Sequence, residues 1–451
     1  IINNVKLKCC GIKEDMRKTL LTMVAMMATS SAMMAQNGIT EIPDPEGVQL
    51  MGTTLSPNGK FFGGVGYGVN EAWIYDMESK KFVAFPAADA EADVQIKSMA
   101  DNGVAVGWSG PAATFDFATE QCTQFGEDGQ YTFMGISPNG KLIVGAHYDG
   151  DDSEGTPCIF NEGTPVDLPQ PSNKFFGATS SGATALSVSN DSIISGYWVD
   201  DMATRPALLW APNRDGKTFM PYPFSRPYFA ATTESTLPFT IFSCDQTVMS
   251  ANGKYLVINY EQYTADREVI QSVARYNTEN DSLELFTPNA EDEMFVDPGS
   301  QVFGCAVSDE GTIIGFYGGL YGPRLGFIWK KGDESIKALA SEFPKATLLA
   351  DYDNGAFNVP SAISADGRYI AGFAYKEDPS SDELGGGYVS WVLDTQYDDT
   401  DAVESAPSAD AANKVVARFT ADGKQVQKDA KVRGFNMMLM RNGKAVKSFN
   451  R

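Results

Sequence analysis

The stretch from Gly135 to Gly150 reads GISPNGKLIVGAHYDG, and it carries the pattern that organises the chain. A polar turn, Pro-Asn-Gly, separates two short runs of apolar residues. Asn-Gly and Asp-Gly pairs between apolar runs predict β-hairpins, because these residues tolerate the positive φ that tight turns require. We therefore expect two antiparallel strands here, joined by a turn at Asn139 and Gly140.

The same phrase occurs seven times along the chain. The copies are LSPNGKFFGG (55–64), MADNGVAVG (99–107), ISPNGKLIVG (136–145), VSNDSIISG (188–196), MSANGKYLVI (249–258), VSDEGTIIG (307–315) and ISADGRYIAG (363–372). The fourth copy lacks the turn glycine and is one residue shorter, so we expect its turn to differ. Repetition at a fixed spacing is the mark of a repeat architecture.

Each copy is followed by further short apolar segments that predict a third and, in most repeats, a fourth strand. After the first copy these are AWIYD (72–76) and KFVAFP (81–86). Four short strands per repeat, at a spacing of roughly 40–60 residues, are typical of propeller blades. The sequence thus predicts an all-β fold, a seven-bladed β-propeller of four-stranded blades at residues 36–396.

The two ends of this region predict how the ring closes. The seventh repeat has no fourth strand, because Leu393 is followed by acidic, loop-like sequence. The segment GITEIPDP (38–45) matches the fourth-strand phrase GTPVDLPQP (163–171). We predict that Ile39–Ile42 supplies the outer strand of the seventh blade, which removes the exposed edges of an open array.

The N-terminal region predicts export. Met16 is followed by Arg17 and Lys18, by the apolar run LLTMVAMMATSSAMMA and by small residues up to Ala35. This order is that of a secretory signal peptide, so we assign residues 16–35 to one and expect residues 1–15 to be upstream read-through. The expected location is secreted or at the cell surface.

Charge is distributed unevenly. Residues 1–35 carry a formal charge of +3 and residues 414–451 carry +8, so the total of −23 leaves −34 on residues 36–413. Such an acidic body repels nucleic acid, which we exclude as a partner. We assign residues 397–413 to an acidic linker and residues 414–451, with Asp422-Gly423 and Asn442-Gly443 turns, to a small C-terminal β-module.

Two resemblances follow from these motifs. The G-I-S-x-D/N-G-x-x-I-V-G phrase with its following strand resembles the extracellular HAF-type repeat of bacterial secreted propellers, over about residues 49–394. That family implies no catalytic residue. The tail resembles the C-terminal sorting domain of the type IX secretion pathway in Gly423-Lys424, Gly434-Phe435-Asn436 and Asn442-Gly443-Lys444. That resemblance implies secretion machinery as a partner.

The loops between second and third strands vary, whereas the first-to-second turns are uniform. Variable loops on a constant scaffold usually carry binding. Each loop opens with an aromatic residue, and acidic residues follow in several. We therefore predict a ligand-binding face with the candidates Tyr67, Trp108, His147, Tyr148, Trp198, Asp200, Tyr260, Tyr317 and Tyr375. Aromatic rings among carboxylates suit a glycan or an extracellular protein. The alternative is that these aromatics pack between blades.

Catalytic and metal chemistry have little support in the sequence. His147 is the single histidine, and no GxSxG motif accompanies it. The acidic run DGDDSEG lacks the Gly and Glu of an EF-hand, so Asp149, Asp151 and Asp152 are weak candidates for calcium, the one cofactor considered. The cysteines 122, 158, 244 and 305 are scattered, and we expect buried free thiols.

The resulting hypothesis is a secreted, monomeric, non-catalytic propeller that binds a glycan or a protein on its variable-loop face. The rival hypothesis is a glycan hydrolase or lyase that uses two carboxylates in the central funnel, since glycosidic bonds are cleaved without histidine.

Overall fold

The computed structural model describes residues 38–43, 48–87, 92–150, 155–169, 180–200, 207–212, 219–223, 247–263, 269–280, 282–286, 300–319, 323–377 and 386–397, together with the strands of a C-terminal unit. The chain divides into two compact units between Thr395 and Gln396. Among the described residues, no helix has the length and apolar character needed to cross a membrane.

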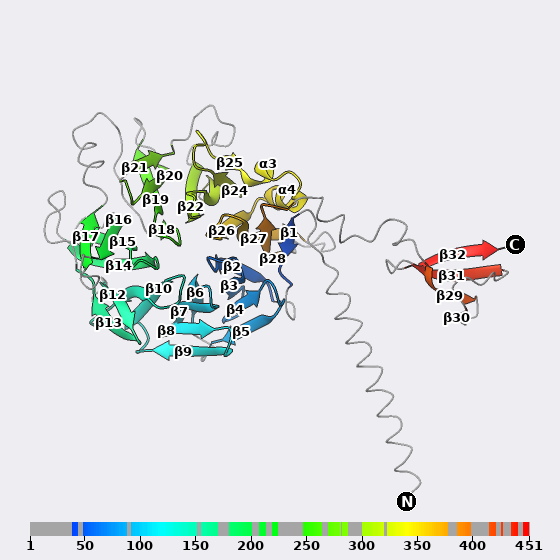
Figure 1. Ribbon diagram of the computed structural model, residues 1–451, viewed down its shortest axis with the longest axis horizontal. Coiled ribbons are helices and arrows are strands. Elements are labelled where there is room, and N and C mark those ends of the chain that lie inside the picture. Colours follow the sequence, from blue (N-terminus) through cyan, green and yellow to red (C-terminus); the bar gives the residue numbers. More distant parts are fainter. Residues whose placement is uncertain are drawn as a thin grey trace, which may run out of the picture. The chain divides into compact units, whose positions relative to one another are not determined.

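Seven antiparallel sheets of four strands each surround a common axis, which confirms the predicted propeller (Figure 1). Blades 1 to 3 use consecutive strands, which are β2 (Leu50–Leu55), β3 (Phe61–Gly66), β4 (Glu71–Asp76), β5 (Phe82–Pro86), β6 (Val94–Met99), β7 (Val104–Ser109), β8 (Ala112–Asp116), β9 (Gln121–Phe125), β10 (Tyr131–Ile136), β11 (Ile143–His147), β12 (Thr156–Asn161) and β13 (Thr164–Asp167). Blades 4 to 6 continue with β14 (Ser180–Val188), β15 (Ile194–Asp200), β16 (Ala207–Pro212), β17 (Phe219–Pro223), β18 (Val248–Met249), β19 (Tyr255–Tyr263), β20 (Val269–Asn277), β21 (Ser282–Leu285), β22 (Ser300–Val307), β23 (Ile313–Gly319), β24 (Arg324–Trp329) and β25 (Lys337–Ala338).

Blade 7 is closed by the N-terminal strand, as predicted. It contains β26 (Asn358–Ile363), β27 (Tyr369–Glu377) and β28 (Gly386–Asp394), and β1 (Ile39–Glu41) is its outer strand. Ile39 pairs with Leu393 in antiparallel register, and the Ile42 amide donates to the Ser390 carbonyl. In Figure 1 the blue β1 lies beside the orange strands of blade 7.

Two helices that the sequence analysis does not predict connect blade 6 to blade 7. They are α3 (Leu339–Glu342) and α4 (Thr347–Asn354). Tyr352 of α4 donates a hydrogen bond to the Glu41 carboxylate on β1, 2.8 Å away, and Lys376 donates to the same oxygen. Burial, followed by the Glu41 charge, raises the pKa of Tyr352. The helices therefore help to hold the closing strand.

The repeated turn connects neighbouring blades. In six copies its first residue is a serine, at most 2% exposed, and in the second copy it is the buried Ala100. The Ser56 hydroxyl accepts from the Phe61 amide and donates to Asn58. The Asn58 amide in turn donates to the Asp101 carboxylate of the next blade, 2.8 Å away. Equivalent hydrogen bonds join Asn139 to Asn190 and Asn252 to Asp309, so the repeated turn also helps to hold neighbouring blades together.

The fourth turn keeps the hydrogen bonds of the other short copies, contrary to our expectation. Ser192 occupies the glycine position with a φ of 63°, and its amide donates to the Ser189 carbonyl. Gly311 makes the same contact with Ser308 in the sixth copy. The surrounding strands therefore impose the turn on a residue that disfavours it.

We expect Ser192→Gly to stabilise the protein by roughly 0.5–1 kcal/mol, because positive φ costs an L-residue about 1–2 kcal/mol and part of the gain is lost to glycine's greater unfolded-state entropy. The measurement is the midpoint of thermal unfolding. Gly253→Ala, at a φ of 76°, is the reverse control and should lower it. An unchanged or lower midpoint for Ser192→Gly would contradict the prediction.

A second repeated glycine faces a β-bulge in the first strand of its blade. In six blades the first-strand register shifts by one residue, as between Gly304 and Ala306 in blade 6. The glycine opposite is Gly315, and an added Cβ would lie 2.0 Å from the Phe303 carbonyl oxygen. Only glycine allows this close approach of two backbones.

The C-terminal unit is a four-stranded antiparallel sheet in the order β30-β29-β31-β32. Its strands are β29 (Val415–Thr420), β30 (Gln425–Val426), β31 (Gly434–Met440) and β32 (Ala445–Asn450). The strands β29–β30 and β31–β32 form the two predicted hairpin pairs.

The described cysteines are free thiols. Cys158 is buried, but Cys122 is exposed on β9, so the expectation of burial is wrong for that residue. Cys244 lies outside the described residues.

Candidate functional site

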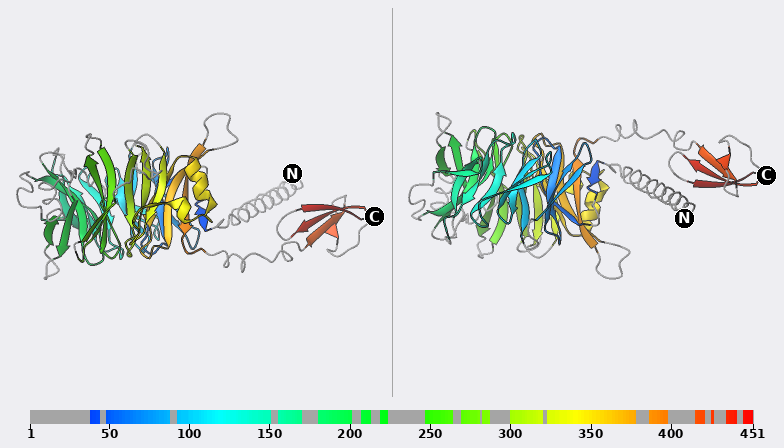
Figure 2. Two further views of the ribbon diagram at one scale, coloured as in Figure 1. Left: turned by 90° about the horizontal axis from the view of Figure 1, so that it is seen from above. Right: turned by 90° about the horizontal axis from the view of Figure 1, so that it is seen from below.

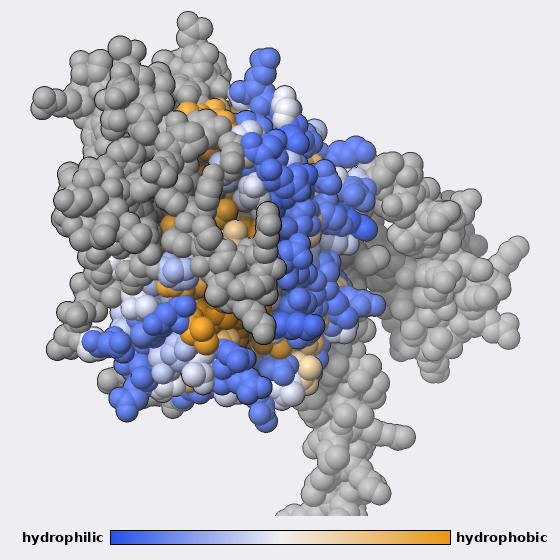
Figure 3. Space-filling view, turned by 60° about the vertical axis from the view of Figure 1, so that its left-hand side comes forward, coloured by the Kyte–Doolittle hydropathy of each residue, from blue (hydrophilic) through white to orange (hydrophobic). Residues whose placement is uncertain are grey.

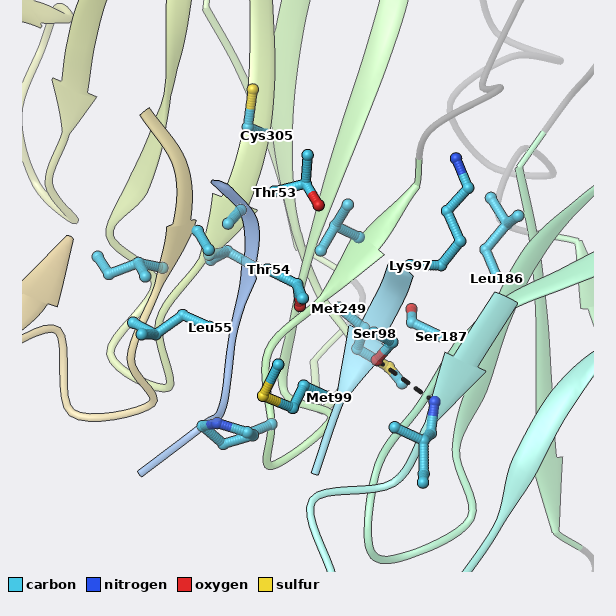
Figure 4. Close-up of a pocket in the computed structure, with 18 of the residues that line it drawn as sticks. Thr53, Thr54, Leu55, Lys97, Ser98, Met99, Leu186, Ser187, Met249 and Cys305 are labelled. Atoms are coloured by element: carbon cyan, nitrogen blue, oxygen red, sulfur yellow. Dashed lines mark hydrogen bonds between the residues drawn. The ribbon is translucent and has the colours of Figure 1, made fainter. Parts of the chain in front are cut away.

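A cavity of about 440 Å³, here called the channel, lies inside the ring. First strands of all seven blades line it, and Figure 4 shows Thr53 and Cys305 facing Lys97 and Leu186 across it. The volume is within the usual range for small-molecule sites. Figure 2 shows the ring edge-on, with the strands running between its two faces.

The β-bulges determine which side chains enter the channel. At a bulge, one extra residue interrupts the alternation of side chains between the two faces of the strand. Six blades each have one such residue lining the channel, and we call these six residues the bulge ring. They are Thr53, Lys97, Met134, Leu186, Cys305 and Ser361. Blade 5 contributes Thr247 and Val248.

Lys97 is the one charged residue among the described residues of the channel wall. Its side chain reaches the solvent of the channel, but the protein around the channel partly desolvates it. This desolvation lowers the pKa of Lys97, and the charge of Asp93 opposes the shift. Its ammonium lies 4.7 Å from the centre of the Trp108 ring. The Trp108 Nε1–H donates to Asp93 Oδ2, 2.9 Å away, so Trp108 is a half-buried partner of Lys97.

The structure brings two of the predicted aromatics together on the variable-loop face. Tyr67 follows β3 of blade 1, and its ring centre lies 4.8 Å from that of Tyr388 on β28. Tyr375 on β27 lies 5.7 Å from Tyr388. Tyr67 is 55% exposed, whereas Tyr375 and Tyr388 are half-buried. Three tyrosines from blades 1 and 7 thus form one surface.

Residues that the sequence analysis missed complete this surface. Phe357 precedes β26, and its ring packs 5.7 Å from Tyr388. Arg324, at the start of β24, lies over Phe357 and over Phe316 of β23. We call Tyr67, Phe357, Tyr375, Tyr388 and Arg324 the tyrosine cluster. Burial, then the neighbouring Tyr67 and Tyr375, raises the pKa of Tyr388, and Arg324 opposes this shift.

The other predicted aromatics have different surroundings. Tyr317 is 7% exposed and packs in the core between blades 5 and 6, as the packing alternative proposes for it. Tyr148 is half-buried. Trp198 and Asp200 lie near the end of β15 and Tyr260 lies within β19, and their side chains are outside the described residues.

His147 sits between two carboxylates. Its Nε2 lies 2.8 Å from Asp167 Oδ1 on β13, and its Nδ1 lies 3.6 Å from Asp149 Oδ1. The side chain is 14% exposed. Within the described residues these carboxylates are its only polar side-chain partners, so no hydroxyl or thiol nucleophile is paired with it.

The calcium candidates are described only in part. Asp149 has an exposed side chain, whereas Asp151 and Asp152 lie outside the described residues. In the described part of the chain no group of three or more His, Cys, Asp or Glu side chains has the geometry of a metal site.

No known family and no curated protein matches this chain. The resemblances to HAF-type repeats and to the sorting domain therefore rest on the quoted motifs alone.

Several solved structures are similar to the chain at low identity. The β-propeller domain of Cps50 (Swd1) from Myceliophteria thermophila is 12% identical, with a TM-score of 0.46 over 78% of this chain and 98% of that one. Hydrazine synthase from Kuenenia stuttgartiensis is 13% identical, with a TM-score of 0.44 over 79% and 100%. The propeller domain of the Trilobed protease from Pyrococcus furiosus is 13% identical, with a TM-score of 0.40 over 64% and 83%. We base the fold on the strand pairing above.

Proposed function

We propose that this protein is a secreted, non-catalytic binding protein whose partner is a protein that docks on the variable-loop face. The observation that carries this proposal is the tyrosine cluster, which gathers aromatic rings and one arginine from blades 1, 6 and 7.

The composition of the cluster favours a protein partner. Tyrosine and arginine are enriched among the residues that dominate binding energy at protein interfaces. The rings of Tyr375, Tyr388 and Phe357 are already packed against one another, so little side-chain entropy is lost on binding. Exposed Tyr67 offers apolar area and a phenolic hydroxyl at the same place.

A glycan is the second candidate, and the exposure of Tyr67 supports it. A flat ring with a hydroxyl group beside polar groups suits a sugar face. Gln49 supplies such a group, since its carbonyl accepts from the Tyr388 amide and its amide nitrogen lies beside Gly387.

The carboxylate-enzyme alternative has less support. The described lining of the channel contains no Asp or Glu, so it offers no carboxylate pair for glycoside hydrolysis. His147 with Asp167 lies on blade 3, without a paired nucleophile among the described residues.

Export is part of the proposal and rests on the sequence. Residues 16–35 are proposed as a signal peptide and residues 414–451 as a sorting module, with calcium at the Asp149 loop as the one candidate ion. If so, the protein recovered from culture medium has an N-terminus close to Gln36. Recovery only inside cells, with residues 16–35 retained, would contradict export.

The binding site is tested with Tyr67→Ala and a matched control. Val166 on β13 has the same exposed fraction, 55%, but lies on the outer strand of blade 3, so Val166→Ala removes an exposed apolar side chain elsewhere on the propeller. The full chain and both variants are exposed to the extracellular fraction of the producing cells with a chemical crosslinker, and to a glycan array.

We expect Tyr67→Ala to reduce capture of a specific protein by about ten-fold or more, the effect of losing an interface hot spot, and Val166→Ala to leave it unchanged. If Tyr67→Ala loses binding only on the glycan array, the partner is a glycan and not a protein. Equal effects of the two variants on both readouts would overturn the placement of the site.

A further inference from the structure

The bulge ring falls into two chemically different sectors, whereas the rest of the channel wall mixes polar and apolar side chains. Going round the ring, blades 7, 1 and 2 present Ser361, Thr53 and Lys97. Blades 3, 4 and 5 present Met134, Leu186 and, beside Thr247, Val248. Thr247 is itself buried. The bulge ring therefore gives hydroxyls and an ammonium on one side and apolar side chains on the other.

Cys305 of blade 6 belongs with the uncharged part of the wall. Burial raises the pKa of its thiol to about 12, although Arg324 opposes the shift. The thiol is therefore neutral near pH 7, and Lys97 keeps the only charge on the described wall.

The Lys97 ammonium has no ion-pair partner among the described residues. The ammonium lies over the face of the Trp108 ring. The Asp93 carboxylate, whose charge raises the pKa of Lys97, already accepts a hydrogen bond from Trp108 Nε1. A partly desolvated ammonium retains donors for a ligand anion. Residues 36–413 carry a formal charge of −34, so the positive charge of Lys97 on the channel wall differs in sign from the net charge around it.

We propose that the channel binds a small amphipathic monocarboxylate, with its carboxylate at Lys97 and its apolar body against Met134, Leu186 and Val248. The volume admits a small molecule rather than a folded segment. The single ammonium of Lys97 can pair with one carboxylate of a ligand, and the net negative charge of residues 36–413 repels a ligand with several negative charges. The three apolar side chains supply the area that a hydrocarbon body would bury.

The test uses octanoate and its neutral analogue octanamide, titrated into the full chain by calorimetry. We expect octanoate to bind about ten-fold more tightly than octanamide, since only the carboxylate forms a charge-assisted hydrogen bond. Lys97→Met should abolish this preference, and Lys97→Arg should retain it.

Two further variants separate the channel from general effects. Lys141→Met removes an exposed lysine from a first-to-second turn and should leave both affinities unchanged. Leu186→Ser should weaken octanoate and octanamide alike. Equal binding of the two ligands, no binding of either, or an unchanged preference in a folded Lys97→Met protein would overturn the proposal. Circular dichroism checks that each variant is folded.

Discussion

Ile39→Asp in the full chain is expected to release the closing strand and to destabilise the propeller by about 3 kcal/mol or more. Ile39 is 1% exposed and packs against the core that includes Leu393 and Trp391. The substitution removes a buried apolar side chain, worth about 1.5–3 kcal/mol, and places an unpaired carboxylate in its position. Once β1 leaves β28, blade 7 has an open edge.

Thermal unfolding and limited proteolysis measure this effect. Ile39→Val keeps the site apolar and should cost only about 0.5–1.5 kcal/mol. Thr40→Asp places the same charge on the neighbouring, partly exposed position of the same strand. If Ile39→Asp and Thr40→Asp unfold at the same temperature, burial of Ile39 does not secure the closure.

The second large effect is expected for Gly315→Ala. An added Cβ would lie 2.0 Å from the Phe303 carbonyl oxygen and 2.9 Å from the Gly304 Cα, both of them backbone atoms. Backbone cannot rotate away as a side chain can, so β22 must shift from β23. Overpacking of this kind costs about 1–3 kcal/mol and sometimes more, and we expect the upper end.

Gly332→Ala is the control because it separates collision from backbone strain. Gly332 has a φ of 88°, and no heavy atom lies within 4 Å of an added Cβ. Its substitution should cost only the strain of positive φ, about 1–2 kcal/mol. Chemical denaturation compares the two variants, and an equal loss of unfolding free energy would refute the role of the bulge contact.

The propeller surface carries both hydrophilic and apolar areas. Figure 3 shows a view on which hydrophilic side chains form a continuous area and apolar side chains gather in smaller ones. Because apolar side chains are common on protein surfaces, the tyrosine cluster, defined by ring contacts, is the more informative feature.

The sequence determined the elements that depend on local rules. Asn-Gly and Asp-Gly turns between alternating runs predict hairpins, so seven copies of the phrase predict seven blades. The match between GITEIPDP and GTPVDLPQP predicted the closing strand, because both must fit the outer edge of a blade. In contrast, α3 and α4 interrupt the repeat and carry no copy of its pattern.

Only the tertiary structure decided which side chains share a site. Tyr67 and Tyr388 are far apart in sequence and meet because the ring places blade 1 beside blade 7. No pattern in the sequence indicates that Lys97 lines the channel, because a β-bulge and not the regular alternation of the strand directs its side chain there. Tyr317 follows Gly315 by two residues, whereas Tyr67 follows the equivalent Gly64 by three, and this offset of one residue accompanies the burial of Tyr317 and the exposure of Tyr67. A repeat fixes backbone geometry through local turns, whereas exposure and contact depend on what the next blade presents.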